Sequence, residues 1–140
     1  MTEEFLTDVQ TIIGPVLAGF GFELAAFQDD IDEDGVAGSV AFYRSPDCQL
    51  QIYNSKRAGE INCMIALVGA AQVYGLFDRT GEWQYLARFA DRAELAELIR
   101  SEGTGFPTER EELERIKTRI ERFYPIAHAG ILKMSGNLGQ

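Results

Sequence analysis

The sequence predicts an α+β protein in which an N-terminal helix and C-terminal helices pack on one face of an antiparallel β-meander of about four to five strands. Two observations lead to this prediction. Apolar and polar residues alternate through 39–68, in three runs separated by turn residues. Apolar residues recur every three or four positions in 2–18 and again beyond 91, as on one face of a helix. Because no linker or repeat divides the 140 residues, a single domain is expected.

The three runs of the meander differ in how their two faces are composed. The first run is marked by Val40 and Phe42. In Cys48–Asn54, apolar residues alternate with glutamine and tyrosine, which predicts a strand with one face in solvent. In Ile61–Val68 both faces are apolar, which predicts a central strand. Turns are expected at 45–47, which contains a proline, and at 54–59.

Alternation leaves the register of the last two strands open. Leu50 fits opposite either Cys63 or Ile61, and the second register would place Cys48 beside Cys63. Both cysteines are predicted to be small buried hydrophobes rather than a redox pair, because each lies on an apolar strand face.

The N-terminal part contains the predicted first helix and first strand. Thr2–Ala18 is expected to be helical, with a kink or break at Gly14-Pro15. Phe22–Gln28 is expected to be a strand, followed by an acidic loop at Asp29–Gly35. The residues predicted on one side of that strand are Phe22, Leu24 and Ala26.

The pattern is weaker between the meander and the last helices. Val73–Phe77 is a candidate fifth strand, and Glu82–Phe89 fits either a strand or the start of a helix. A helix is expected to begin at Asp91. Its predicted buried stripe is Leu95, Leu98 and Ile99.

The last long helix is predicted to start with a capping box, in which Thr108 and Glu111 exchange hydrogen bonds. Pro125 is expected to end it, and Ile126–Met134 to form a short separate helix. The tail 135–140 is expected to fray. The predicted apolar seam is Leu113, Ile116, Ile120 and Phe123.

Charge restricts the classes of partner. The chain has 13 basic and 22 acidic residues, for a formal net charge of −9. A field of this sign repels phosphate backbones and anionic membranes, so nucleic acid and membrane are not expected partners, whereas a basic protein is. The acidic N-terminus and the absence of a long apolar run predict a cytoplasmic protein.

One motif resembles half of a calcium-binding loop. Asp30, Asp32, Asp34 and Gly35 match the first half of an EF-hand, but its twelfth position, where a bidentate glutamate belongs, is Ala41. The preferred interpretation is a solvated acidic loop, and its functional version is a loop that docks a basic partner electrostatically. Calcium at the three aspartates is the weaker alternative.

The sequence contains no recognisable catalytic or cofactor-binding constellation. His128 is the only histidine and has no serine, cysteine or aspartate grouped with it locally, so a packing or helix-end role is predicted. Two cysteines separated by 14 residues and one histidine do not predict a zinc site. Neither a P-loop nor a dinucleotide fingerprint occurs, so no cofactor is expected.

The predicted partner-binding residues are acidic or aromatic, with one arginine. For Trp83 and Tyr85 the alternative is that they close the core, and Tyr53 and Arg57 are equally ambiguous. The full set is Asp29, Asp30, Asp32, Glu33, Asp34, Tyr53, Arg57, Trp83 and Tyr85.

Three short segments carry a family resemblance. With Gly21-Phe22 after the first helix, Arg57-Ala58-Gly59-Glu60 between strands and Trp83-x-Tyr85-Leu86 near a turn, the chain resembles small bacterial immunity proteins of contact-dependent or polymorphic toxin systems. The resemblance implies a protein that neutralises a cognate toxin, commonly a nuclease, by binding it.

The leading hypothesis is therefore a non-catalytic acidic binding module. The alternative is a small enzyme or ligand-binding domain with a pocket between the sheet and the C-terminal helices, using carboxylates, tyrosines and His128. A homodimer through a sheet edge or face is a further alternative.

Overall fold

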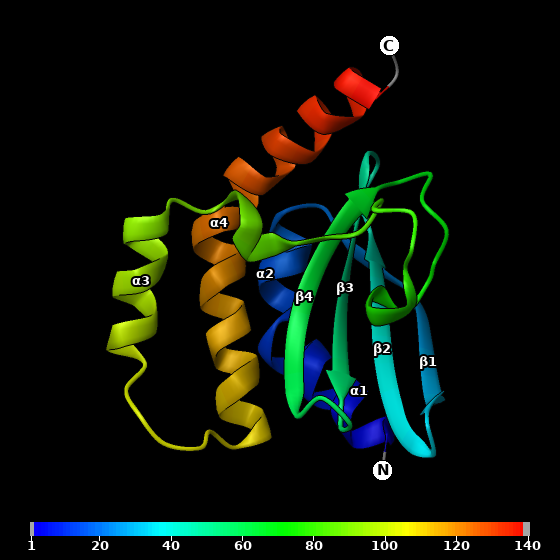
Figure 1. Ribbon diagram of the computed structural model, residues 1–140, viewed down its shortest axis with the longest axis vertical. Helices are drawn as coiled ribbons and strands as arrows, with labels where there is room; N and C mark the ends of the chain where they lie inside the picture. The colour runs from blue at the N-terminus through cyan, green and yellow to red at the C-terminus, as the bar shows by residue number, and fades with distance from the viewer. Residues whose placement is uncertain (1, 139–140) are drawn as a thin grey trace.

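The computed structural model describes residues 2–138 and places them in one sheet with helices on one of its faces (Figure 1). The α+β prediction is confirmed. The elements in chain order are α1 (Thr2–Ile12), α2 (Gly14–Gly19), β1 (Glu23–Glu33), β2 (Val36–Arg44), β3 (Cys48–Ser55), β4 (Glu60–Leu67), the 3-10 turn η1 (Gly75–Phe77), β5 (Gln84–Tyr85), the 3-10 turn η2 (Leu86–Phe89), α3 (Arg92–Ser101) and α4 (Glu109–Leu138).

The sheet is a simple meander in which each strand pairs antiparallel with the next, in the order β1-β2-β3-β4-β5. The fifth strand is Gln84–Tyr85 and not the candidate Val73–Phe77, which contains η1 instead. Of the two structures considered for Glu82–Phe89, the chain adopts a short piece of strand followed by the 3-10 turn η2.

The register of β3 and β4 differs from both predicted registers. Leu50 lies opposite Ile65, and Cys48 lies opposite Leu67, so the two cysteines are not paired. The faces were predicted correctly, because Leu50 does face an odd-numbered residue. The shift arises because β3 continues to Ser55 and the turn occupies only 56–59. A shorter turn moves every pair toward a later partner on β4.

β1 is longer and less regular than predicted. Residues 29–33 belong to the strand, and only Asp34 and Gly35 form the turn to β2. The pairing with β2 shifts by one residue between Leu24 and Ala26, and again between Gln28 and Ile31. Each shift is a β-bulge, which turns the side chains after it to the other face of the sheet. Phe22 and Ala26 therefore pack into different cores, and Leu24 is 37% exposed.

One face of the sheet packs against helices. Apolar side chains from α1, α2 and α4 meet the alternate residues of β2, β3 and β4. The first helix breaks at Ile13, directly before Gly14-Pro15, as predicted. The predicted seam of α4 is buried: Leu113, Ile116, Ile120 and Phe123 are each at most 3% exposed.

α4 continues through Pro125, which corrects the predicted interruption. Its ribbon changes direction along its length in Figure 1, as expected where proline removes a hydrogen bond from the helix. Ala127 and Ile131 lie beyond the proline and are 0% and 4% exposed, so their burial stabilises the continuation. The tail predicted to fray, 135–140, lies partly outside the described residues, which include α4 to Leu138.

The two helix starts have the predicted capping chemistry. The Glu94 amide donates to Asp91 Oδ2 at 3.0 Å. The amide of Glu111 donates to Thr108 Oγ1 at 3.1 Å, and the amide of Thr108 donates to Glu111 Oε1 at 2.9 Å. In α3 the predicted stripe is only partly correct, because Ile99 is 51% exposed.

The opposite face of the sheet is covered by residues 68–83, which we call the covering segment. The prediction that β3 exposes one face to solvent is wrong, because all eight of its residues are buried. Gln51 donates to the Val73 carbonyl at 3.0 Å and accepts from the Gly75 amide at 2.8 Å. Gln49 donates to the carbonyls of Val68 and Ala70 at 3.0 and 2.8 Å. The two glutamines thus form hydrogen bonds with backbone groups of the irregular covering segment. Without these bonds, those backbone groups would be buried and unpaired.

A second apolar core lies beneath the covering segment. It contains Val40 and Phe42 of β2 together with Met64, Tyr74 and Trp83. The Trp83 ring packs on Phe42 with centroids 5.8 Å apart, and its indole N–H donates to the Ala71 carbonyl at 2.9 Å. The sheet is therefore sandwiched between α-helices and a largely irregular layer that contains only the short 3-10 turn η1.

We predict that Gln51→Met destabilises the protein. Methionine keeps the length of the side chain but leaves the Gly75 amide and the Val73 carbonyl unpaired. The free energy of unfolding should fall by about 2 kcal/mol, measured by urea denaturation. Gln10→Met, at an exposed position of α1, is the control and should change it by less than about 0.5 kcal/mol. Equal small effects would contradict the role given to Gln51.

We also predict opposite effects of two glycine-to-alanine changes in helices. A Cβ at Gly130 of α4 would collide with the Phe89 ring of η2, whereas one at Gly19 of α2 meets no heavy atom within 4 Å. Gly130→Ala should therefore lower the free energy of unfolding by about 1–3 kcal/mol, although alanine favours helix. Gly19→Ala should leave it unchanged or raise it. Stabilisation by Gly130→Ala in thermal unfolding would show that η2 does not dock closely on α4.

Candidate functional site

The β1–β2 hairpin presents acidic residues in unusual backbone conformations. Asp30 at the second bulge and Asp34 in the turn have φ of 54° and 56°. Aspartate is one of the few side chains that tolerate this region. The Asp29 carboxylate accepts from the amide of Asp30, and the Asp32 carboxylate from the amide of Gly35, both at 2.6 Å. These local bonds hold the hairpin in shape while leaving its carboxylates exposed.

Glu33 is the acidic residue of the hairpin that points inward. It is 5% exposed and accepts hydrogen bonds from Ser55 Oγ and Tyr74 Oη, each 3.0 Å from Glu33 Oε1. Burial and the adjacent Glu33 raise the pKa of Tyr74, so its hydroxyl stays protonated and donates. Glu33 therefore joins β1, β3 and the covering segment. Glu33 was predicted to bind a partner, but it is buried and holds the fold together instead.

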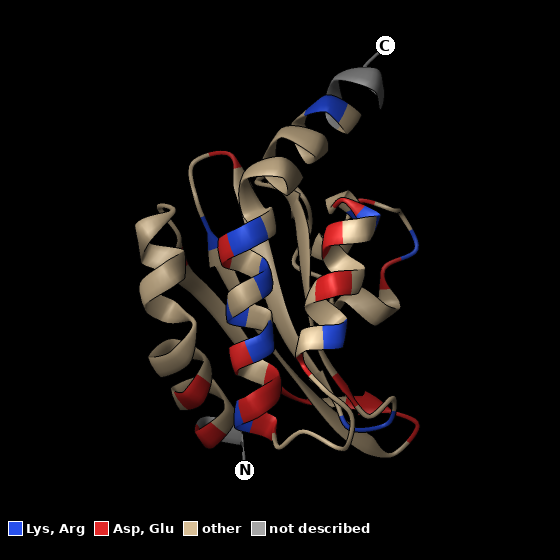
Figure 2. Cartoon of the chain, turned by 90° about the vertical axis from the view of Figure 1, so that its left-hand side faces the viewer, with Lys and Arg blue, Asp and Glu red and all other residues tan. Residues whose placement is uncertain are grey.

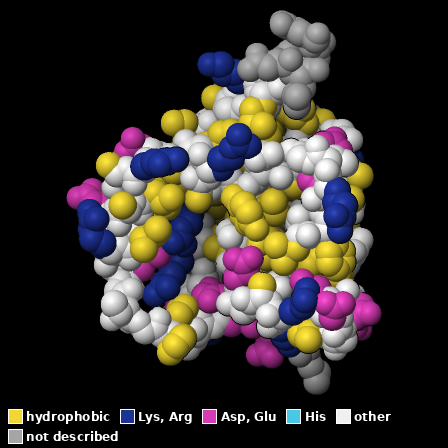
Figure 3. Space-filling model, viewed as in Figure 1, with side chains coloured by type: hydrophobic (Ala, Val, Ile, Leu, Met, Phe, Trp, Pro, Cys, Tyr) yellow, Lys and Arg dark blue, Asp and Glu magenta, His cyan; other side chains and the backbone are white. Residues whose placement is uncertain are grey.

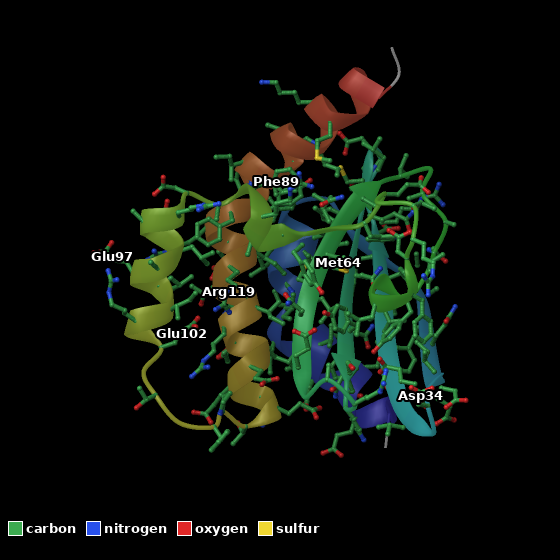
Figure 4. The ribbon with its side chains drawn as sticks, viewed as in Figure 1. Asp34, Met64, Phe89, Glu97, Glu102 and Arg119 are labelled. Carbon is green, nitrogen blue, oxygen red and sulfur yellow. The ribbon has the colours of Figure 1, made fainter. Side chains whose placement is uncertain are left out.

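A salt bridge links the ends of two hairpins. Arg57, in the β3–β4 turn, lies 3.0 Å from Asp34 Oδ2. Asp34 is labelled at the lower end of the sheet in Figure 4. The two side chains are 59% and 79% exposed, so the pair stabilises the fold by less than about 1 kcal/mol. Its main consequence is that the acidic segment and the arginine, both predicted to bind a partner, lie together on one surface.

A shallow pocket of about 460 Å³ lies beside this salt bridge, lined by Glu33, Arg57, Ala58, Leu76 and Phe77. Phe77 is 47% exposed, with its ring edge-on to Tyr74 at a centroid distance of 5.1 Å. Figure 3 shows apolar side chains gathered over the covering segment, with charged side chains of both signs beside them. We call the exposed aspartates of the β1–β2 hairpin, together with the neighbouring arginine and phenylalanine, the hairpin-end surface. Its members are Asp29, Asp30, Asp32, Asp34, Arg57 and Phe77.

The predicted aromatic anchors lie elsewhere. Trp83 is 4% exposed and Tyr53 is fully buried. The Tyr53 hydroxyl donates to Glu60 Oε1 at 2.8 Å and lies 3.3 Å from Tyr85 Oη. Only Tyr85 of the three is exposed, at 39%. The structure thus places Trp83 and Tyr53 in the second core, which was the alternative considered for Trp83. Phe77, which sequence reasoning missed, is the exposed aromatic residue of the hairpin-end surface.

The calcium alternative finds little geometric support. Asp32 is bonded within the turn and Asp34 pairs with Arg57. Among the residues that the structure describes, these carboxylates form no three-ligand cluster; the one such group combines Asp47, Cys48 and His128.

That group involves the histidine for which no local partner was predicted. His128 Nε2 lies 2.8 Å from Asp47 Oδ2, 81 positions away in the sequence. This hydrogen bond lowers the pKa of Asp47, so its carboxylate is an acceptor and Nε2 carries the donated proton. Burial raises the pKa of the neighbouring Cys48 thiol to about 12. The arrangement differs from a nucleophilic triad, because the thiol is protonated and donates no hydrogen bond to the histidine in this structure.

A groove also exists between the sheet edge and the C-terminal helices, where the alternative hypothesis expects a pocket. It has a volume of about 320 Å³ and appears as the hollow beside α3 in Figure 3. Arg119 spans it to Glu102 at 2.8 Å, and both residues are labelled in Figure 4. The lining residues are Ile61, Asn62, Ala87, Leu95, Ile99, Glu112, Arg115, Ile116 and Arg119. They include neither a tyrosine nor His128.

No protein-family model, curated protein or solved structure matches the chain. The resemblance to immunity proteins therefore rests on the sequence segments alone. Within residues 2–138, none of the helices has the length and apolar composition needed to cross a bilayer.

We predict that Glu33→Ala loosens the hairpin-end surface. The substitution leaves the hydroxyls of Ser55 and Tyr74 without their buried acceptor, so the free energy of unfolding should fall by about 2 kcal/mol in urea denaturation. Glu23→Ala, at the exposed start of the same strand, is the matched control and should have an effect below about 0.5 kcal/mol. If both variants unfold at the same urea concentration as the wild type, the hydrogen bonds of Glu33 with Ser55 and Tyr74 do not stabilise the fold.

Proposed function

We propose that the protein is a non-catalytic binding module whose hairpin-end surface binds a basic protein. The observation that supports this most is the exposed Phe77 at a shallow pocket that Arg57 also lines, with the exposed Asp34 paired to Arg57. Protein interfaces commonly place an aromatic anchor at the centre and polar groups at the rim. The anchor would supply most of the binding free energy, and the acidic rim would select the sign of the partner's charge.

The charge distribution supports a basic partner. Figure 2 shows Asp and Glu gathered toward the end of the molecule that carries the hairpin ends and the first turns of α1 and α4. The formal net charge of −9 adds a field of the same sign. Such a field accelerates association with a basic protein and weakens with ionic strength.

A toxin-neutralising role is the specific form of this proposal. It derives from the resemblance to immunity proteins and from the chemistry of their targets, since a nuclease carries a basic substrate-binding surface that an acidic protein can occlude. The homodimer has less support, because the free edge strand β1 carries two bulges and a run of acidic residues, which disfavour edge-to-edge pairing.

The alternative of a small enzyme gains little from the groove beside α3. Its lining combines apolar residues with three ionisable side chains, Glu112, Arg115 and Arg119. Arg119 is already paired with Glu102. A general acid or base paired with a nucleophile is the feature that would favour this alternative.

The proposal is tested with any basic protein that a gene beside this chain's own encodes. Asp29→Asn, Asp30→Asn and Asp32→Asn together remove three charges, and asparagine tolerates the same backbone conformations. We expect this triple variant to raise Kd by about tenfold or more at low salt and to reduce its salt dependence. The control neutralises three exposed glutamates elsewhere, Glu94, Glu97 and Glu121.

Two results would contradict the proposal. If both triple variants weaken binding equally, only the overall charge matters and the hairpin-end surface is not the site. If the neighbouring product does not bind and pull-down retains no basic protein, the protein-binding role is lost.

Light scattering on the purified chain measures the homodimer separately.

Phe77→Ala should affect the lifetime of the same complex. Removing the anchor should raise the dissociation rate by about tenfold with little change in the association rate, as measured by surface plasmon resonance. Ile99→Ala, an exposed apolar residue on α3, is the control and should leave both rates unchanged. Unchanged dissociation in Phe77→Ala would remove Phe77 from the interface.

A further inference from the structure

Three metal-ligating side chains meet where the turn between β2 and β3 contacts α4. Asp47, Cys48 and His128 each offer one ligand atom, and these atoms lie within 4.8 Å of one another. They comprise one oxygen, one sulfur and one nitrogen donor, and 81 positions separate Asp47 from His128 in the sequence. This cluster is separate from the hairpin-end surface and independent of the function proposed above.

The turn fixes the two ligands that it carries. Ser45 is the centre of this arrangement: its amide donates to the Cys48 carbonyl at 2.9 Å and its Oγ accepts from the Cys48 amide at 3.0 Å. The Asp47 carbonyl accepts from the Val68 amide at 3.0 Å. Ser45 Oγ also lies 3.2 Å from Asp47 Oδ1, which leaves Oδ2 directed to His128. Such supporting bonds orient ligands in metal sites.

The third ligand is held by an aromatic neighbour. The His128 ring stacks on Tyr124, one turn earlier in α4, with centroids 5.4 Å apart and an interplanar angle of 24°. Tyr124 is 6% exposed and itself packs edge-on against Phe22. The imidazole therefore has a defined orientation toward the turn.

We propose that Asp47, Cys48 and His128 form a Zn²⁺ site with three protein ligands. Zinc prefers nitrogen and sulfur donors, often with a carboxylate, whereas calcium and magnesium prefer oxygen alone. A thiolate and a carboxylate also balance the two positive charges of the ion. Ligand atoms in a tetrahedral zinc site are about 3.3–3.8 Å apart, so these side chains need shifts of only about 1 Å. On binding, the thiol proton passes to water and the imidazole changes tautomer: Nε2 gives its proton to water and binds the metal, while Nδ1 takes up a proton from water.

The burial of the ligands indicates where the ion would lie. Cys48 is fully buried, whereas the side chains of Asp47 and His128 are 49% and 33% exposed. The ion would therefore have the thiolate beneath it and solvent above it, with water as a fourth, exchangeable ligand. Three protein ligands and one water are typical of zinc sites that exchange ligands, whereas structural sites have four protein ligands.

Titration of the full-length, metal-free protein with Zn²⁺ tests the proposal. We expect one equivalent to bind with a Kd of about 1 µM or tighter in a competition assay with a chromophoric chelator. Co²⁺ in place of Zn²⁺ should give a thiolate-to-cobalt absorption band. Cys48→Ser should abolish that band, and Cys63→Ser, which changes the other buried thiol, should retain it.

The partly exposed ligands provide variants that do not depend on the core. Asp47→Asn and His128→Gln should each weaken Zn²⁺ binding by about tenfold or more. Circular dichroism checks that each variant is folded. If Cys48→Ser does not fold, the wild-type cobalt spectrum and the His128→Gln titration decide the matter. Absence of Zn²⁺ binding in the wild-type protein, or binding that survives both Asp47→Asn and His128→Gln, would overturn the proposal.

Discussion

The structure depends on one constraint: the sheet is buried on both faces, yet one of its two covering layers has almost no regular secondary structure. Backbone groups in such a layer have few partners of their own, and leaving them unpaired under cover is costly. Gln49 and Gln51 meet this requirement, because their amide groups donate to and accept from the covering segment. Two polar residues in the middle of a buried strand thus fix the position of an otherwise irregular stretch of chain.

The position of the covering segment determines the candidate surface. Gly75 lies directly over β3, where any Cβ would collide with Met64 Sδ, so the segment approaches the sheet as closely as backbone allows. η1 begins there and ends at Phe77, which is why this aromatic residue reaches the hairpin ends. The buried Glu33 closes the same layer from the side of β1 through Ser55 and Tyr74. The hairpin-end surface is therefore rigid at its base, although its charged rim is in solvent.

Sequence reasoning succeeded where the information is local and failed where it is not. Alternation predicted the correct faces in the meander, and Thr108 and Glu111 identified the start of α4. The same alternation misplaced Gln49 and Gln51 in solvent, because a polar residue on a strand looks the same whether water or a buried backbone group binds it. The contact of Asp47 with His128 joins positions 81 apart, and no spacing rule detects it. Phe77 was missed because the covering segment has no periodicity.

Hydrogen exchange of the backbone amides, measured residue by residue, tests the central claim most directly. If the glutamines hold the covering segment on the sheet, the Gly75 amide, bonded to Gln51 Oε1 at 2.8 Å, should exchange as slowly as amides of β3. The amides of β4 provide the internal reference within the same molecule. Exchange of residues 70–77 at the rate of an unfolded chain, with β3 and β4 still protected, would show that the second face of the sheet is open and would contradict this account.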